Sequence, residues 1–322
     1  MNARRRLGRS DIEITPIGLG CWQFSGGKGV GGAFWDATPP STMDAIVAAS
    51  LRGGVNWFDT AEVYGNGRSE KALAHALHAA GQKNGEVVVA TKWWPILRTA
   101  ANIGATIGDR LRCLGGFGID LHQVHFPHAL SSIAAQMRAM ADLVAAGQIR
   151  TDGLSNFSAR AMRTAHAALA SHGLPLVSNQ VRYSLLHRRI EDNGVLATAR
   201  ELGITIIAYS PLAQGILTGK YHQDPTLIRS RSGPRKWMPS FRGRGLAKSR
   251  AVVEELRRIA TAHGATPSQI ALAWVVQMHG DAVVAIPGAS SVRQAEENAA
   301  AMALELTADE RARLDVLSQG GG

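Results

Sequence analysis

The sequence is poor in cysteine, has fewer acidic than basic residues, and contains no long hydrophobic run. Two of its 322 residues are cysteines, Cys21 and Cys113, and they form neither a CxxC pair nor a metal-ligand spacing. This argues against a disulfide framework or a cysteine-ligated zinc site and favours a reduced, cytoplasmic protein. No stretch reaches the roughly 18 apolar residues of a membrane span, and no signal-peptide pattern follows the N-terminal arginines. We therefore expect neither a membrane protein nor a secreted one.

The shortage of acidic residues leaves a formal net charge of +10. A basic excess favours an anionic partner, such as nucleic acid, an acidic membrane surface or a phosphorylated small molecule, although a solvated basic surface also explains it. Basic residues cluster in RRRLGR (4–9), in RSRSGPRK (229–236) and in RGR (242–244). No aromatic residues interleave with the first cluster and no nucleic-acid motif follows it. We therefore expect no nucleic-acid partner and no membrane partner.

Short apolar runs rich in β-branched residues recur along the chain. Eight of them are found, at 14–20, 55–59, 86–92, 119–126, 149–156, 176–181, 204–210 and 282–288. Runs that are apolar throughout are typical of strands buried on both faces of a parallel sheet. Helical patterns with start and stop signals lie between them, at 40–54, 131–147, 249–264 and 266–280. This alternation predicts an α/β protein, a (β/α)₈ TIM barrel that forms a single domain over 1–322.

Three segments fall outside the repeating pattern. Residues 1–16 predict a short N-terminal β-hairpin with Gly8 in its turn, and residues 305–322 predict a C-terminal helix and a glycine tail. Residues 211–247 carry no strand pattern, and a loop of that length in a compact domain is usually functional or disordered. The alternative fold is an open doubly wound sheet, which would need a GxGxxG turn after its first strand. The first strand here gives GLGCWQF, which lacks the third glycine.

Four ionisable residues follow three consecutive predicted strands. Asp59 ends the second strand, Tyr64 lies in the loop after it, Lys92 ends the third strand and His125 ends the fourth. The carboxyl ends of barrel strands meet at one face, where the chemistry of this fold is found. A lysine beside a tyrosine favours the phenolate and lowers the pKa of the tyrosine, while a carboxylate holds the lysine in place. The set predicts proton transfer to a carbonyl, with histidine positioning the carbonyl oxygen.

Each of these residues also has an ordinary explanation when taken alone. Asp59 could cap a helix, Tyr64 could be a packing residue and His125 could be a buried core histidine. A metal site is another alternative, because HFPH (125–128) contains two histidines. Pro127 disfavours a helical histidine pair, and Lys92 would oppose a cation, so no metal is expected.

Five stretches of the sequence carry a family resemblance: DTAEVYGNGRSE (59–70), GLSNF (153–157), NQVRYS (179–184), AYSPLAQGILTGKY (208–221) and IPGASSVRQAEEN (286–298). On these stretches the chain resembles the aldo-keto reductase superfamily, in its bacterial type without the long C-terminal loop. The first is similar to that family's DTA-x-x-Y-G-x-G-x-S-E signature, and the other four are similar to its cofactor motifs. The resemblance implies a (β/α)₈ barrel that binds NADPH, with a catalytic tetrad at Asp59, Tyr64, Lys92 and His125. It also implies a small-molecule aldehyde or ketone as partner, and we expect a monomer or a small homo-oligomer.

The resemblance also implies where the cofactor lies, and the loop 211–247 is then expected on the cofactor side. The implied cofactor-binding residues are Gly20, Cys21, Trp22, Asp59, Ser155, Asn156, Gln180, Tyr209, Ser210, Pro211, Leu212, Gln214, Gly215, Lys220, Arg231, Gly288, Ser290, Gln294, Glu297 and Asn298. NADPH is expected from the resemblance. NADH stays the alternative, because the segment GASS (288–291) holds no cation and the nearest one is Arg293.

Aromatic residues are expected to rim the substrate pocket. They are Trp22, Phe24, Trp93, Trp94 and Phe126. Aromatic walls favour flat, apolar aldehydes or ketones, with ordinary packing at the top of the barrel as the alternative. A different class of function stays open: a cofactor-binding regulatory module resembling the potassium-channel β subunits. A metal-dependent hydrolase built on the same barrel is a more distant alternative. Neither the natural substrate nor the physiological direction follows from the sequence.

Overall fold

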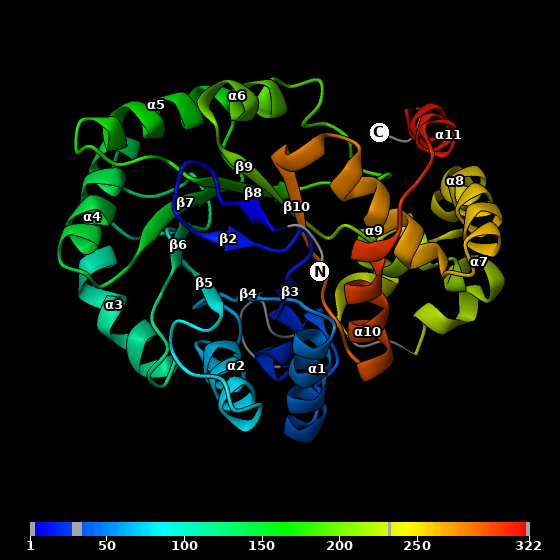
Figure 1. Cartoon of the computed structure of the whole chain (residues 1–322), viewed down its shortest axis with the longest axis horizontal. Coiled ribbons are helices and arrows are strands. Elements are labelled where there is room, and N and C mark those ends of the chain that lie inside the picture. The colour runs from blue at the N-terminus through cyan, green and yellow to red at the C-terminus, as the bar shows by residue number, and fades with distance from the viewer. Residues whose placement is uncertain (1–3, 28–33, 231–232, 320–322) are drawn as a thin grey trace.

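The computed structural model describes residues 4–27, 34–230 and 233–319. Within these ranges eight parallel strands form one sheet, in which each strand pairs with the next along the chain. The strands are β3 (Leu19–Gly20), β4 (Trp57–Asp59), β5 (Val88–Trp93), β6 (Leu121–Val124), β7 (Thr151–Ser155), β8 (Ser178–Arg182), β9 (Thr205–Tyr209) and β10 (Val283–Ile286). Each strand lies within or overlaps one of the eight predicted runs, and the (β/α)₈ fold is confirmed (Figure 1).

The sheet closes between its first and last strands. Ile17 forms a parallel bridge with Ala285, and Gly20 forms another with Gly288. The backbone N–H of Gly18 donates to the carbonyl of Ala285 at 2.9 Å, which extends the pairing beyond the two residues of β3. A Cβ at Gly20 would lie 2.8 Å from the carbonyl oxygen of Ile286, so this seam requires glycine.

Helices surround the barrel, as Figure 1 shows. They are α1 (Pro40–Arg52), α2 (Arg68–Ala79), α3 (Ala101–Cys113), α4 (Ile133–Ala145), α5 (Ala159–Ala170), α6 (Val195–Leu202), α7 (Lys220–Gln223), α8 (Gly243–Ala262), α9 (Pro267–Gln277), α10 (Val292–Ala300) and α11 (Ala308–Ser318). Their starts follow local chemistry: Ser132 caps α4, and Thr266 and Thr307 form capping boxes at α9 and α11.

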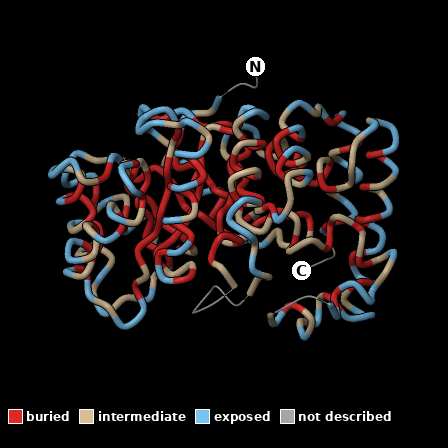
Figure 2. Tube along the Cα trace, turned by 90° about the horizontal axis from the view of Figure 1, so that it is seen from below, coloured by how far each residue is buried: buried red, intermediate tan, exposed pale blue. Residues whose placement is uncertain are grey.

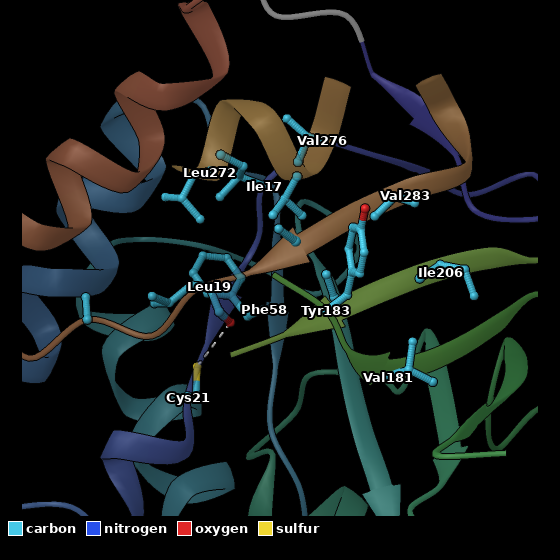
Figure 3. Packing of buried hydrophobic residues seen from close by; sticks show 14 of the residues in the cluster. Ile17, Leu19, Cys21, Phe58, Val181, Tyr183, Ile206, Leu272, Val276 and Val283 are labelled. Carbon is cyan, nitrogen blue, oxygen red and sulfur yellow. Dashed lines mark hydrogen bonds between the residues drawn. The ribbon is translucent and has the colours of Figure 1, made fainter. Parts of the chain in front are cut away.

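The main hydrophobic core lies between the sheet and the helices. Figure 3 shows Leu272 and Val276 of α9 close to Ile17 of the barrel wall. All three side chains are almost fully buried. The tube in Figure 2 is buried through its centre and exposed along its outer turns. The helices therefore hold the strands by burial of apolar surface, which leaves the ends of the barrel as the places for a site.

A two-stranded hairpin covers the N-terminal end of the barrel. Its strands are β1 (Arg5–Arg6) and β2 (Glu13–Ile14), and Gly8 in the turn has a φ of 56°. Leu7, Ile12 and Ile14 pack into a second hydrophobic cluster with residues from inside the barrel, including Trp57. Because this end is filled with apolar side chains, a site inside the barrel opens only at the C-terminal ends of the strands.

The segment 211–247 is more regular than the sequence suggests. It contains α7 and short 3₁₀ turns at Ala213–Thr218, Pro225–Ile228, Pro234–Trp237 and Pro239–Phe241, and α8 begins within it at Gly243. The predicted helix at 249–264 therefore starts six residues earlier. None of the helices in the described parts of the chain has the length and apolar character that crossing a membrane requires.

Candidate active site

A buried ion pair lies at the ends of two neighbouring strands. Lys92 Nζ at the end of β5 donates to Asp59 Oδ1 at the end of β4 and to the carbonyl of Thr60, the latter at 2.8 Å. The Lys92 side chain is fully buried and that of Asp59 is 2% exposed. Charges so far from water persist only when they are paired and hydrogen-bonded. The parallel pairing of β4 with β5 brings these two residues of different strands together.

Two glutamine side chains complete the surroundings of the Asp59 carboxylate. Gln123 Nε2 donates to Asp59 Oδ2 at 3.0 Å, and Gln180 Nε2 donates to the same oxygen at 2.9 Å. Gln123 is on β6 and Gln180 on β8, and both are buried. The carboxylate thus has a partner at each oxygen, which fixes its orientation toward Lys92. Sequence reasoning missed Gln123. Side chains alternate along β6, so the Gln123 side chain points into the barrel like that of Leu121.

Tyr64 lies above this pair, with the centroid of its ring 5.1 Å from Lys92 Nζ. Burial raises the pKa of Tyr64 well above its usual value, and the negative charge of Asp59 raises it further. The expectation that Lys92 lowers the pKa of Tyr64 is therefore wrong for the protein without a cofactor. The Asp59 charge compensates the lysine charge, and burial still raises the pKa. The hydroxyl keeps its proton at neutral pH and can donate it in a hydrogen bond.

His125 stands beside Tyr64 with the two ring centroids 5.7 Å apart, in an edge arrangement. Burial lowers the pKa of His125 well below its usual value, and the nearby Lys92 charge lowers it further. The imidazole is therefore neutral at pH 7. Its ring stacks on Phe126 and meets Trp94 edge-on, which holds its plane in place. A neutral imidazole in this position can donate a hydrogen bond to an oxygen without carrying a charge.

These residues meet at a cavity of about 1070 Å³, which Asp59, Tyr64, His125, Trp94 and Phe126 help to line. Pockets for small ligands commonly measure about 300–1,000 Å³. The cavity extends away from them past Tyr209 to the start of α10. It is large enough to hold a long cofactor together with a small second molecule.

Comparison with known proteins agrees with this geometry. The model of the Aldo/keto reductase family matches residues 16–319. The chain belongs to the aldo-keto reductase family. An uncharacterized oxidoreductase of Mycobacterium tuberculosis is 41% identical over 299 residues, covering 93% of this chain and 88% of that protein.

Solved aldo-keto reductase structures have the same fold. Glycerol dehydrogenase from Gluconobacter oxydans is 28% identical with a TM-score of 0.82, over 98% of this chain and 94% of that one. An aldo/keto reductase from Klebsiella pneumoniae, solved with NADP and acetate, is 27% identical with a TM-score of 0.74, over 98% and 95% of the two chains. This aldo-keto reductase is accordingly an NAD(P)H-dependent oxidoreductase of small carbonyl compounds.

One end of the cavity suits a nicotinamide. Ser155 ends β7, and Asn156 follows it with a φ of 65°. Its Nδ2 donates to the carbonyl of His125 at 3.2 Å, and its Oδ1 accepts from the Tyr209 hydroxyl at 3.0 Å. Tyr209 thereby presents a fixed aromatic ring to the cavity. A flat ring beside amide donors and acceptors matches a nicotinamide carboxamide.

The middle of the cavity suits a pyrophosphate. Ser210, Ala213, Gln214 and Gly215 all have positive φ angles, of 51°, 46°, 58° and 99°. Such a backbone lets the chain curve closely around a ligand, as phosphate-binding turns do. An ideal Cβ on Gly215 would lie 3.9 Å from Lys220 Nζ, so the turn and an ammonium group are adjacent. The donor set therefore fits the phosphates of a dinucleotide.

The far end of the cavity suits a ribose and an adenine. The N–H and hydroxyl of Ser290 donate to Gln294 Oε1 at 2.8 and 3.0 Å, and Asn298 donates to the carbonyl of Gly288 at 3.3 Å. Arg293 forms an ion pair with Glu297 at 3.3 Å, with the arginine side chain 81% exposed. The first of these groups lie at the start of α10, where a helix N-terminus attracts negative charge, while Glu297 and Asn298 lie further along the helix.

Most of the predicted site residues line this one cavity. They are Gly20, Cys21, Trp22, Asp59, Tyr64, Trp94, His125, Phe126, Ser155, Asn156, Gln180, Tyr209, Ser210, Pro211, Leu212, Gln214, Gly215, Lys220, Gly288, Ser290, Gln294, Glu297 and Asn298. Lys92 lies just behind the wall, against Asp59. Arg231 is outside the described residues. Each residue's role at the cavity stays a prediction.

Two predicted pocket residues point the other way. Phe24 and Trp93 are each 1% exposed and belong to the core between the sheet and the helices. Trp93 follows the inward-facing Lys92 on β5, so the alternation of side chains along a strand turns it outward. There its Nε1 donates to Asn102 Oδ1 of α3 at 3.0 Å. The prediction that they rim the pocket is wrong.

Several cavity residues were not foreseen, among them Trp35, Asp36 and Arg235. Arg235 Cζ lies 4.2 Å from the ring centroid of Trp35, and Arg235 Nη2 lies 3.9 Å from Asp36 Oδ2. All three residues line the cavity. Trp35 meets Trp22 edge-on at 5.7 Å between the ring centroids. The loop before α1 and the loop before α8 therefore meet at the cavity. The only sequence signal was the position of Arg235 in the second basic cluster. The described residues hold no group of three or more potential metal ligands.

Proposed function

We propose that this aldo-keto reductase reduces aldehydes or ketones to alcohols with NADPH, and that Tyr64 is the general acid. When bound, the reduced nicotinamide supplies a hydride to the carbonyl carbon. Tyr64 donates its proton to the carbonyl oxygen, and the neutral imidazole of His125 donates a hydrogen bond that positions this oxygen. The tyrosinate formed lies close to the Lys92 ammonium, which stabilises its charge until solvent returns a proton.

The observation that carries the proposal is the buried Asp59–Lys92 pair directly behind two cavity-lining proton donors. Lys92 Nζ is 5.1 Å from the ring centroid of Tyr64, and His125 is the next ring along the wall. In the protein alone Tyr64 stays protonated, as an acid must. Asp59 is anchored by two amides, so the lysine cannot easily turn away from the tyrosine.

The cofactor proposal is NADPH, with NADH as the alternative to be measured against it. The middle and far ends of the cavity offer Lys220, Arg257 and Arg293 as cations for phosphate groups. Trp94 and Phe126 form an aromatic wall beside His125, which favours flat, apolar carbonyl compounds. Dissociation constants for the two cofactors, measured by quenching of tryptophan fluorescence, would decide between them.

The test is NADPH oxidation at 340 nm with an activated aromatic aldehyde, for the wild type and Tyr64→Phe. We expect turnover in the wild type and a loss of at least about 10²-fold in the variant, because the proton donor is removed. NADPH should still quench the tryptophan fluorescence of the variant. Cofactor binding without turnover on a broad panel of aldehydes and ketones would instead favour a binding module.

A further inference from the structure

Glu62 lies in the turn between Asp59 and Tyr64 but does not line the cavity. Its side chain is buried, and the residue is 6% exposed. Its backbone is tied into the same turn: the N–H of Glu62 donates to the carbonyl of Lys92 at 3.3 Å, and its carbonyl accepts from Gly67 at 2.8 Å. A buried carboxylate is costly unless it is paired, so its contacts are informative.

One oxygen of Glu62 holds the neighbouring loop. Glu62 Oε1 accepts from the backbone N–H of Trp94 at 2.6 Å and from Arg98 Nη1 at 2.6 Å. Trp94 forms part of the cavity wall next to His125. The loop that carries Tyr64 and the loop that carries Trp94 are therefore joined through a single carboxylate, by two short hydrogen bonds with an ionised acceptor.

The other oxygen of Glu62 faces a second buried cation. Arg110 Nη1 on α3 is 3.7 Å from Glu62 Oε2 and 2.9 Å from Glu70 Oε2 on α2. Glu70 in turn accepts from the hydroxyl of Thr91 at 2.6 Å, one residue before Lys92. The two carboxylates thus link the Tyr64 turn to β5 from outside the barrel, while the Asp59–Lys92 pair links β4 to β5 from inside.

We propose that Glu62 is a positioning residue that holds Tyr64 in place relative to the wall formed by Trp94 and His125. The inference rests on the proposed role of Tyr64 as the acid. A tyrosine on a turn needs a fixed distance to the carbonyl oxygen, because small displacements of a reacting group cost large factors in rate. Glu62 supplies this constraint through its charge, since two guanidinium groups face it.

Glu62→Gln tests the inference. The amide keeps the shape and an oxygen for the Trp94 N–H, but it removes the charge. We expect the single-turnover rate of carbonyl reduction to fall about tenfold or more. The Kd for NADPH should stay within about twofold of the wild-type value, since Glu62 touches no part of the cavity that would hold the cofactor. A loss of rate with unchanged cofactor affinity is not what general loosening of the barrel would give.

Two further variants control the experiment. Glu201→Gln removes an exposed carboxylate paired with Arg163, and it should change neither quantity. Arg98→Gln removes one cationic partner of Glu62. The Arg98 side chain is 36% exposed, so this variant should fold and lose less rate than Glu62→Gln. Combining it with Glu62→Gln should add little, because both act through one contact.

The outcomes separate the two levels of the claim. An unchanged single-turnover rate in folded Glu62→Gln, with an active wild type, would overturn the inference and leave the proposed function standing. The same holds if rate and cofactor affinity fall together in proportion to the folded fraction. A wild type that binds NADPH but reduces no carbonyl would overturn both.

Discussion

At the scale of single residues, the site is organised by which charges are compensated. Lys92 and Asp59 compensate each other, so their influence on neighbouring groups is that of a pair. Burial raises the pKa of Tyr64 and lowers that of His125, so Tyr64 keeps its proton and His125 stays neutral. The protein alone holds two neutral hydrogen-bond donors in front of one buried ion pair. That arrangement is suited to an oxygen that gains negative charge during the reaction.

Lys92→Met should expose how much the fold depends on this pair. The substitution leaves the Asp59 carboxylate buried with only its two amide donors, and breaking a buried pair commonly costs about 3–5 kcal/mol. We expect the free energy of unfolding, measured in urea, to fall by about 3 kcal/mol, and turnover to be lost. Lys71→Met, at an exposed position on α2, is the control and should change stability by less than about 0.5 kcal/mol. A loss below about 1 kcal/mol in Lys92→Met would contradict the reasoning.

Residue types and strand ends were enough to predict the four ionisable residues, while the family resemblance supplied the predicted cofactor side of the cavity lining. Each of them follows a run whose length and apolar character mark it as a strand. The partners that hold them were out of reach. Gln123 and Glu62 interact with residues tens of positions away, and nothing local distinguishes them from ordinary polar residues. Trp93 shows a signal that was present but unused, since strict alternation after Lys92 already turns it outward.

At the scale of elements, the strands were easier to predict than the long segment before α9. Gly243 and Gly245 lie inside the first turn of α8 although glycine disfavours helix. A Cβ at Gly245 would fall 2.2 Å from the carbonyl oxygen of Pro239, so close packing on the preceding turn explains the glycine. Tertiary contact, which the sequence pattern does not carry, decides where this helix begins.

The β7 strand carries an acid that should make stability depend on pH. Asp152 is 1% exposed, and burial raises its pKa to about 8. Between the unfolded value near 3.8 and about 8, the folded state holds one more proton than the unfolded state. Stability therefore falls as pH rises through this window, by about 1.4 kcal/mol per pH unit from this group. Two buried histidines, His122 and His125, have lowered pKa values. Below about pH 6.5 the unfolded state binds more protons at these histidines, so their contribution to stability rises with pH.

Asp152→Asn isolates this effect, because an amide of the same shape does not titrate. Between pH 6.5 and 8 we expect the free energy of unfolding to decline less steeply in the variant, by about 1 kcal/mol per pH unit. Glu70, with a pKa raised to about 7, also makes stability fall as pH rises. It does so equally in the wild type and the variant, so its effect cancels in the comparison. Asp142→Asn on the exposed side of α4 should follow the wild type. Parallel curves for wild type and Asp152→Asn would show that Asp152 is not the source.

At the scale of the whole molecule, the net charge of +10 is unevenly distributed. Arg235 lines the cavity. The chain runs from it through residues 236–241 to Arg242 and Arg244, which are exposed at the start of α8. Within the described ranges neither Arg242 nor Arg244 takes part in an ion pair of the kind that holds Arg163 or Arg258. This side of the molecule should therefore attract a multiply charged anion before any contact is made.

Arg242→Glu with Arg244→Glu should slow the association of NADPH about three- to tenfold at about 10 mM ionic strength, where the Debye length is about 30 Å. The matched control is Arg138→Glu with Arg160→Glu, which removes the same charge from α4 and α5, across the barrel from α8 in Figure 1. Stopped-flow tryptophan fluorescence would give both rates. Equal slowing by the two double variants would mean that only the net charge matters. The difference between their association rates should vanish at high salt.

The hairpin that fills the barrel floor has a practical consequence for handling the protein. Because Leu7, Ile12 and Ile14 close that end, the hairpin lies on the side opposite the open ends of the strands. Attachment to a solid support through the hairpin would thus leave the cavity facing the solution, and immobilised protein should retain free diffusion of reactants to the site. The same attachment would pull on residues that pack inside the barrel, so a spacer between support and hairpin would be needed to keep the floor in place.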